Sequence, residues 1–302
     1  METSKAENMT VRHIKQQAPQ FAQTFGVPSF WLTDWLLYVI DKPSSFSITD
    51  ESYQLTASEF ERFNIGVAQM QQGMPLAYLT GRQEFWSLDF KVNAHTLIPR
   101  PDTEVLVEQT LSWIKANKSE FENSDQNKRL LDLGTGSGCI AISLAYELTN
   151  NKCYKQYSWQ VVAVDLSQEA LEVACENAKL NKVINIKFVQ SSWYEQLNND
   201  HADKFDIIVS NPPYIDETDE HLTSLQAEPI SALTAPNQGL ADIEHIVQQA
   251  PQYLQVRGLL AIEHGHDQGQ SVRQLFIKNG FDKVQTVQDF GGNDRVTLGQ
   301  LI

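Results

Sequence analysis

Short apolar runs alternate with helical patterns through the second half of the chain. The runs expected to form strands are residues 129–134, 159–167, 185–192, 205–213, 258–265, 281–289 and 295–302. Strands that alternate with helices are typical of a parallel sheet, because each parallel pair needs a crossover connection. The last two runs are joined by the sequence FGGN, which favours a hairpin instead. The pattern therefore predicts an α/β fold with a doubly wound, mostly parallel sheet.

The first part of the chain has a different pattern. Between residues 11 and 79 the apolar side chains recur at helical spacing, in segments separated by APQ, GVPS, DKPSS and QGMP. Proline and glycine at such places predict helix starts or ends. The next stretch, EFWSLDFKVNAHTLIP, alternates as a hairpin or an extended connector does. We therefore predict a helical domain over residues 1–82, a hairpin linker over 83–98 and an α/β domain over 99–302.

Composition and charge bear on the size of the protein and on whether it binds nucleic acid. A chain of 302 residues that is 41% hydrophobic and 20% charged is ordinary for a globular protein of one large domain or two. It carries 23 Lys and Arg against 38 Asp and Glu, a formal charge of -15. Such a charge repels phosphate backbones, so a broad nucleic-acid-binding face is not expected.

Cysteine usage and hydropathy bear on the compartment. Cys139, Cys153 and Cys175 are odd in number and lack a CxxC pair, so neither a disulfide framework nor a zinc site is expected. The most apolar segment, residues 30–40, is far shorter than the ~20 residues that span a bilayer. The polar start, METSKAENMT, lacks the apolar core of a signal peptide. We expect a cytoplasmic protein with no metal and no membrane anchor.

The sequence LDLGTGSGCIAISLAYEL reads as a strand, a glycine-rich turn and a helix. Gly134, Gly136 and Gly138 let the backbone approach a ligand at the helix N-terminus, which predicts a nucleotide-like ligand. No lysine follows the glycines, so the turn is not a P-loop. Gly136, Gly138 and Ala141 do fit the looser dinucleotide pattern GxGxxA, and an NAD-dependent enzyme stays open on this motif alone.

Two carboxylates favour a different ligand. Asp132, two residues before the first glycine, would oppose a pyrophosphate but suits the ammonium and sulfonium of S-adenosylmethionine. Asp165, which ends the strand VVAVD, is placed to accept hydrogen bonds from ribose hydroxyls, although it would also serve as a cap of the next helix beside Ser167. Trp193, in QSSWYEQL, would line the adenine or, alternatively, plug the edge of the core.

The fourth strand ends in an unusual way, in the sequence SNPPY. In a doubly wound sheet the first and fourth strands are neighbours where the order reverses, so SNPPY should face the glycine-rich turn. Two successive prolines make a rigid stub. The Asn211 side-chain carbonyl and a main-chain carbonyl would then be two acceptors beside the flat ring of Tyr214. That set fits a planar primary amine or amide, while an ordinary proline-rich strand end is the plainer alternative.

Such a nitrogen is a weak nucleophile, because its lone pair is delocalised. Accepting both of its hydrogens raises its electron density, and the rigid stub aims it at the donor methyl at roughly 3 to 3.5 Å. The proton is shed after transfer, so this scheme requires neither a metal nor a strong general base.

Several motifs together resemble one known family. IPRPDTE, DLGTGSG, AVD, SNPPYI and NDRVTLG occur in the order and spacing of the PrmC (HemK) family, the bacterial glutamine methyltransferases of peptide chain release factors. The likeness extends into PLAYLTGRQEFWSLDF and so covers most of the chain. It implies a seven-stranded class I S-adenosylmethionine-dependent methyltransferase with a small N-terminal helical domain that helps to hold the substrate. It also implies the substrate, the glutamine of the Gly-Gly-Gln loop of class 1 release factors.

The resemblance also implies roles for residues. Cofactor contacts carry over to Gly134, Thr135, Gly136, Ser137, Gly138, Asp165, Trp193 and Asn211, and glutamine contacts to Asn211, Pro212, Pro213 and Tyr214, of which Asn211, Pro212 and Tyr214 are the catalytic set. Arg100 would lie near the methionine end of the cofactor, whereas helix capping would by itself explain Asp102 and Glu104. Ser192 departs from the Asp that the family commonly has before the tryptophan, so no acidic adenine contact is implied there.

Rival functions share parts of these motifs. Enzymes that methylate exocyclic amines of adenine in DNA or RNA also use SNPPY, although the acidic chain lacks a basic, aromatic-rich recognition segment. A non-catalytic cofactor-binding protein would need the pocket but not Asn211, and NAD-linked oxidoreduction is a weaker third. A monomer is the default expectation for the oligomeric state.

Overall fold

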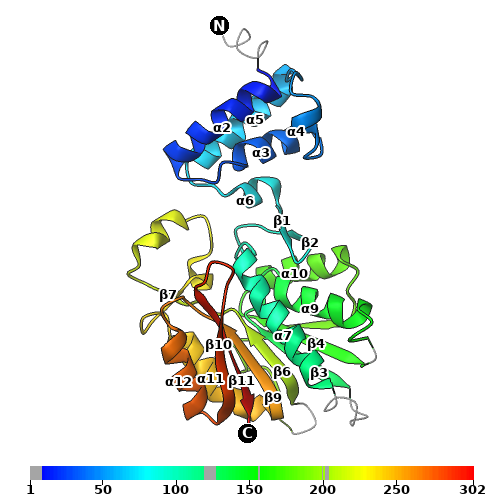
Figure 1. Cartoon of the computed structure of the whole chain (residues 1–302), viewed down its shortest axis with the longest axis vertical. Coiled ribbons are helices and arrows are strands. Elements are labelled where there is room, and N and C mark those ends of the chain that lie inside the picture. The colour runs from blue at the N-terminus through cyan, green and yellow to red at the C-terminus, as the bar shows by residue number, and fades with distance from the viewer. Residues whose placement is uncertain (1–8, 119–126, 156, 199, 201–203) are drawn as a thin grey trace. The chain divides into compact units, whose positions relative to one another are not determined.

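The computed structural model describes residues 9–118, 127–155, 157–198, 200 and 204–302 (Figure 1). Most of the polar start of the chain, residues 1–8, therefore lies outside the described part. The chain divides into two compact units, Met1–Gly81 and Arg82–Ile302.

The first unit is helical, as predicted. Its elements are α2 (Val11–Phe25), α3 (Trp31–Val39), α4 (Phe46–Thr49), α5 (Ala57–Gln71) and α6 (Leu76–Thr80). Helix α5 begins with a capping box, in which Thr56 and Glu59 each bond the other's backbone N–H. The prediction that a helix starts or ends at APQ is wrong, because Pro19 lies inside α2. Pro19 is exposed, so the backbone hydrogen bond that it removes lies on the solvent side and the helix continues.

The core of this unit depends on a glycine. Gly66 of α5 is buried, and the indole of Trp35 from α3 packs directly on it while its Nε1 donates to the Phe63 carbonyl at 2.9 Å. A Cβ at position 66 would lie 2.2 Å from Trp35 Cε2, far inside van der Waals contact.

Gly66→Ala should therefore destabilise the first unit by roughly 1–3 kcal/mol, as overpacked core positions do. Hydrogen exchange of α3 and α5 in the full chain measures this change. The matched control is Gln69→Ala, an exposed position of the same helix, which should change stability by less than about 0.5 kcal/mol. Equal protection in both variants would contradict the packing argument.

The second unit holds a sheet of seven strands in the order β10-β11-β9-β6-β3-β4-β5. The strands are β3 (Lys128–Leu133), β4 (Trp159–Asp165), β5 (Ile186–Gln190), β6 (Phe205–Ser210), β9 (Leu254–Glu263), β10 (Phe281–Gln288) and β11 (Asp294–Leu301). Five of them, β5, β4, β3, β6 and β9, pair in parallel. Strand β11 is antiparallel to both β9 and β10, so the predicted hairpin at FGGN is confirmed.

Helices cover both faces of this sheet (Figure 1). On one face lie α7 (Glu104–Ala116), α9 (Cys139–Asn150) and α10 (Gln168–Leu180), and on the other α11 (Ala241–Tyr253) and α12 (Gly269–Lys278). Successive strand residues alternate between the two cores, because side chains in a strand point to opposite faces. In β3, for example, Leu130 belongs to the α7–α9 core and Leu131 to the α11–α12 core. The predicted α/β, doubly wound class I fold is thus confirmed.

A hairpin precedes the sheet. Its strands, β1 (Arg82–Phe85) and β2 (Leu88–Lys91), are joined by Trp86 and Ser87, whose φ values of 54° and 57° match the primed turns that tight hairpins favour. The buried Asn177 of α10 accepts from the Lys91 N–H at 2.7 Å and donates to the carbonyls of Lys91 (3.0 Å) and Ser137 (2.8 Å). One side chain thereby ties the hairpin to the glycine-rich turn. Small strands β7 (Ile215–Asp216) and β8 (Thr234–Ala235), which pair in parallel, were not predicted.

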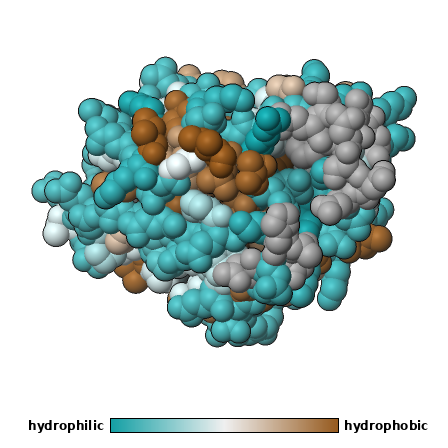
Figure 2. Space-filling model, turned by 90° about the horizontal axis from the view of Figure 1, so that it is seen from below, coloured by the Kyte–Doolittle hydropathy of each residue, from teal (hydrophilic) through white to brown (hydrophobic). Residues whose placement is uncertain are grey.

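One face of the molecule is seen in a space-filling view. The face shown in Figure 2 is mostly hydrophilic, with a main group of hydrophobic residues and others scattered around it. In the described ranges, no helix is both long and apolar enough to cross a membrane.

Candidate functional site

A cavity of about 310 Å³ lies at the carboxyl ends of β3, β4 and β6. Its wall includes residues of the segment before α7 (His95, Thr96, Leu97, Pro99, Arg100 and Thr103), the glycine-rich turn (Gly134, Thr135, Gly136 and Ser137), the end of β4 (Asp165, Leu166 and Ser167), the loop after β5 (Ser191, Ser192 and Trp193) and the stub after β6 (Asn211 and Pro213). Strands β3 and β6 pair in parallel with Leu133 opposite Ser210, so the glycine-rich turn and the stub do face each other.

Three residues assigned from the sequence are not in the cavity wall as far as the structure describes it. Gly138 is the N-cap of α9 and packs against the helices, where a Cβ would lie 2.8 Å from Ile142 Cδ1. Pro212, the first proline of the stub, is buried. Tyr214 is turned toward β9. Gly138 therefore acts through backbone shape, because it lets the turn approach the helices closely.

The glycine-rich turn positions its backbone by left-handed conformations. Gly134 has φ 71°, and a Cβ there would lie 3.4 Å from the Trp193 ring. Trp193 itself has φ 48°, which is uncommon for a large side chain, and its indole lies against the turn at the cavity wall. Three N–H groups of the turn are engaged within the protein: Thr135 donates to the Val164 carbonyl at 2.8 Å, Gly136 to Asp165, and Gly138 to the Thr135 carbonyl at 2.8 Å.

Asp165 is held by two backbone groups at the cavity wall. Its Oδ2 accepts from the Gly136 N–H at 2.7 Å and its Oδ1 from the Ser167 N–H at 2.9 Å. Ser167 is the cap of α10, because its Oγ accepts from the Ala170 N–H at 3.0 Å. Burial raises the pKa of Asp165. Each carboxylate oxygen can accept more than one hydrogen bond, so acceptor capacity remains for ligand hydroxyls.

Asp132 lies beneath the turn and is not part of the described cavity wall. It is fully buried, and its Oδ2 accepts from the Thr135 hydroxyl at 2.6 Å. Burial raises its pKa to about 7. The carboxylate therefore shapes the turn directly, and its influence on a bound ligand passes through the protein.

Asp132→Asn should change how stability depends on pH. The folded-state pKa of about 7 lies above the ordinary 3.8, so the folded state binds the proton more tightly than the unfolded state. The protonated carboxyl of Asp132 contributes its full share to the free energy of unfolding below about pH 4. This share is lost as pH rises through 7, and the free energy of unfolding then changes by at most about 1.4 kcal/mol per pH unit. Urea unfolding of the ligand-free protein measures this effect. As pH rises across this window, the free energy of unfolding of the asparagine variant should increase relative to that of wild type. Parallel curves would contradict the assignment.

Asn211 reaches the segment that precedes α7. Its Nδ2 donates to the Thr103 hydroxyl at 3.2 Å. Thr103 holds the N-cap position of α7 but makes no capping bond with its side chain. The first-turn Glu104 instead accepts from the Trp86 N–H at 2.8 Å and fixes the hairpin.

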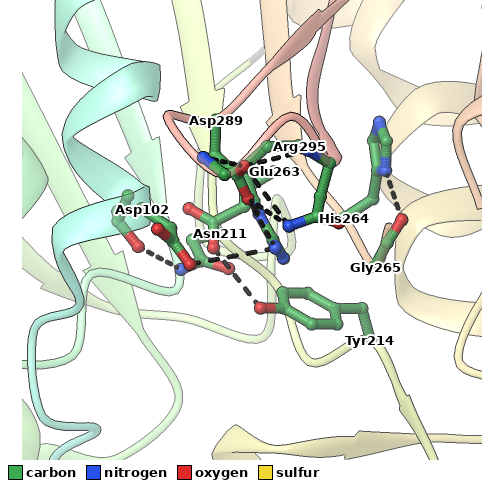
Figure 3. Close-up of polar contacts among 11 residues, drawn as sticks. Asp102, Asn211, Tyr214, Glu263, His264, Gly265, Asp289 and Arg295 are labelled. Atoms are coloured by element: carbon green, nitrogen blue, oxygen red, sulfur yellow. Dashed lines mark hydrogen bonds and ion pairs between the residues drawn. The ribbon is translucent and has the colours of Figure 1, made fainter. Parts of the chain in front are cut away.

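Tyr214 is held at both its main chain and its hydroxyl, and Figure 3 shows the hydroxyl contact. Its main-chain carbonyl accepts from Gln268 Nε2 at 3.0 Å, and its hydroxyl donates to Glu263 Oε1 at 3.4 Å. Burial raises the pKa of Tyr214 above its ordinary value. The ring is thus anchored beside Glu263 at the end of β9, and the flat face expected for a ligand is not part of the described cavity wall.

The turn between β10 and β11, to which the sequence assigned no chemistry, reaches the site through an ion pair. Asp289 accepts from the backbone N–H of Gly291 (2.9 Å) and of Asn293 (3.0 Å) and pairs with Arg295 at 2.9 Å. The Asn293 bond lowers the pKa of Asp289. Arg295 also lies 3.8 Å from Asp102, as Figure 3 shows.

Four residues of the site were missed by sequence reasoning. Thr103 and Asp242 line the cavity, while the buried Glu228 and Glu263 stand behind it. Glu228 accepts from the Ile98 N–H at 3.0 Å and pairs with Arg100, and so holds the segment that carries Arg100. Asp242, in the first turn of α11, reads in the sequence as an ordinary helix-start acid. No pattern in the sequence marked the other three as parts of one site.

A larger hollow, of about 670 Å³, lies at the other end of the strands. It is lined by residues such as Arg129, Gln160 and Asn185 and by none of the motif residues. Within the described ranges, no group of three or more His, Cys, Asp or Glu side chains is arranged to hold a metal ion. The motif residues line the smaller cavity instead.

Comparison with known proteins identifies the family of the chain. Residues 124–290 match the family described as a methyltransferase domain. The release factor glutamine methyltransferase of Aliivibrio fischeri is 43% identical over 269 residues, which cover 88% of each chain. That of Pasteurella multocida is 45% identical over 269 residues, which cover 87% of this chain and 88% of its own.

A solved structure supports the fold. The delta-N METTL16 MTase domain superposes with a TM-score of 0.50 at 19% identity, over 72% of this chain and 89% of that domain. From its sequence relatives and the methyltransferase match, the chain belongs to the release factor glutamine methyltransferase family, whose methyl donor is S-adenosyl-L-methionine.

Proposed function

We propose that this protein methylates the side-chain amide nitrogen of the glutamine in the Gly-Gly-Gln loop of class 1 peptide chain release factors. The observation that carries the proposal is the position of Asn211, on a rigid stub that shares one cavity wall with the glycine-rich turn. The names of the relatives support the release factor as substrate. The helical domain, residues 1–82, and the linker, residues 83–98, are proposed to help bind the protein substrate, and one copy of the chain is proposed to be the working unit.

The cavity fits S-adenosylmethionine in the chemistry of its walls. Asp165 supplies acceptors suited to ribose hydroxyls, Trp193 supplies an apolar aromatic wall, and the glycine-rich turn lets the backbone come close to a ligand. Arg100, at the same wall, suits the carboxylate of the methionine portion. When bound, the cofactor supplies an electrophilic methyl group on a sulfonium.

The stub is proposed to orient the glutamine. The Asn211 Oδ1 and a main-chain carbonyl of the stub accept the two N–H groups of the amide, which raises electron density on nitrogen and fixes its direction. Pro213 contributes a rigid apolar contact at the cavity wall. Pro212 and Tyr214 act from behind the wall, because one is buried and the other is anchored to Gln268 and Glu263.

The competing function is methylation of an adenine amine in DNA or RNA, which the same stub would serve. Its test is a side-by-side reaction of the purified protein with labelled S-adenosylmethionine, a release factor and adenine-containing oligonucleotides. We expect label on the release factor only. Preferential labelling of the oligonucleotides would overturn the substrate assignment.

A further inference from the structure

The stub after β6 is rigid in its middle, so its position depends on how its two ends are held. At its near end the Ser210 hydroxyl donates to the Leu133 carbonyl at 2.7 Å, beside the pairing of β6 with β3. Pro212 and Pro213 have no N–H group and cannot donate to an anchor. The far end is Tyr214. Because the two prolines between the ends are stiff, a displacement of Tyr214 also moves the main-chain carbonyls of the stub.

One buried side chain holds the far end. Gln268, the N-cap residue of α12, is only 8% exposed. Its Nε2 donates to the Tyr214 carbonyl at 3.0 Å and to the Gln238 carbonyl at 2.9 Å, while its Oε1 accepts from the Gly265 N–H at 2.9 Å. The amide of Gln268 therefore joins three segments, which are the stub, the turn before α11 and the loop after β9.

The partners of this amide allow only one orientation. A main-chain carbonyl accepts and does not donate, whereas a main-chain N–H donates and does not accept. If the amide of Gln268 were flipped, its oxygen would face two carbonyl oxygens and its NH₂ group would face the Gly265 N–H. Both N–H donors of Gln268 are thus committed to Tyr214 and Gln238.

The turn before α11 is strained, and it lies against the same residue of the stub. Asn237, Gln238 and Gly239 have successive left-handed φ values of 57°, 56° and 77°, a conformation that is costly for a residue such as glutamine. A Cβ on Gly239 would lie 1.9 Å from the Tyr214 main-chain oxygen, so the turn and the stub are in close contact. Strained backbone persists only where the surrounding structure holds it. The bond from Gln268 to the Gln238 carbonyl is one such restraint.

We propose that Gln268 is a positioning residue for methyl transfer: its amide holds the strained turn against Tyr214 and fixes the far end of the stub, so that Asn211 and the stub carbonyls keep one arrangement toward the methyl donor. Gln268 itself is not part of the described cavity wall. The inference rests on the proposed function of the site. It gives a part in the reaction to the segment HDQG, for which no role was predicted from the sequence.

The test is single-turnover methylation of a release factor by two variants of Gln268, at a pH where a glutamate is ionised. Gln268→Met keeps the length of the side chain but removes all three hydrogen bonds. Gln268→Glu keeps an oxygen for the Gly265 N–H but sets a carboxylate oxygen against the two carbonyls. Both variants should lower the rate by about tenfold to a hundredfold, the scale of a small misplacement of a reacting group. Their dissociation constants for S-adenosylmethionine should equal that of wild type.

The matched control is Gln300→Met. Gln300 is also buried, and its Nε2 also donates to a main-chain carbonyl, that of Arg257, at 2.8 Å. In the sheet it pairs with Leu259, away from the carboxyl end of β9. The rate of this variant should equal that of wild type.

A wild-type rate in either Gln268 variant would overturn the inference, because the two N–H donors would then not be needed. A loss of S-adenosylmethionine binding as large as the loss of rate would also overturn it, because the effect would then not be confined to the stub. So would a Gln300→Met variant as slow as the Gln268 variants. In each of these cases wild-type transfer sustains the proposed function. A wild-type protein that labels no release factor overturns the proposed function and this inference together.

Discussion

Replacing Asn211 with alanine is expected to lower methyl transfer by roughly 10²- to 10³-fold, the scale on which loss of one preorganised polar contact to a reacting group is felt. The side chain is on the stub after β6 and opens onto the cavity, so its loss removes one of the two acceptors for the substrate amide. Cofactor binding should largely survive, because the glycine-rich turn, Asp165 and Trp193 remain in the wall. Single-turnover rates and calorimetric titration of S-adenosylmethionine measure the two effects separately.

The control for this variant is Asn185→Ala, at the hollow on the other end of the strands, which should turn over like wild type. Unchanged turnover of Asn211→Ala would refute its role. If cofactor binding falls by as much as turnover, the role of Asn211 is to bind the cofactor and not to orient the substrate.

Gly239→Ala is expected to disable the site from a position outside it. Gly239 has φ 77°, and a Cβ there would lie 1.9 Å from the Tyr214 main-chain oxygen and 2.8 Å from Gln268 Nε2. The backbone of Tyr214 must move, and its bond from Gln268 must break, which displaces the stub that carries Asn211. A left-handed alanine costs about 1–2 kcal/mol and overpacking a further 1–3 kcal/mol. We expect a large fall in unfolding free energy in urea together with a severe loss of transfer.

Gly280→Ala separates the two destabilising effects of Gly239→Ala, which are the left-handed backbone and the overpacking. Gly280 has φ 86°, yet a Cβ at this position meets nothing within 4 Å. This variant should lose only about 1–2 kcal/mol and keep its turnover. If Gly239→Ala is no worse than Gly280→Ala in stability and in rate, the close approach to Tyr214 has no functional consequence.

The sheet was predictable because each strand has a strong local signal. The apolar runs of β3, β4, β6 and β9 are flanked by turn residues, and parallel order follows from the helices between them. Pairing of β3 with β6 then places the glycine-rich turn opposite the stub without further information. The motifs DLGTGSG and SNPPY could for this reason be assigned to one site from the sequence.

The rest of the site could not be predicted, because it depends on burial and on side-chain direction. Asp132 reads as a ligand-facing acid, but the turn folds over it and its carboxyl bonds Thr135 instead. Tyr214 is predicted from the sequence to contact the substrate, and the residues that hold it in place, Gln268 and Glu263, lie far along the chain from it. The contact between Thr103 and Asn211 spans 108 positions and involves an ordinary residue type, so no local pattern marks it.

The most direct test of the account is to locate the transferred methyl group. A purified release factor is incubated with the protein and S-adenosylmethionine, digested, and its Gly-Gly-Gln peptide is fragmented in a mass spectrometer. One added methyl group is expected on the side-chain amide of that glutamine, and none is expected when the glutamine is replaced. A methyl group on another residue, or equal modification of the replaced protein, would contradict it.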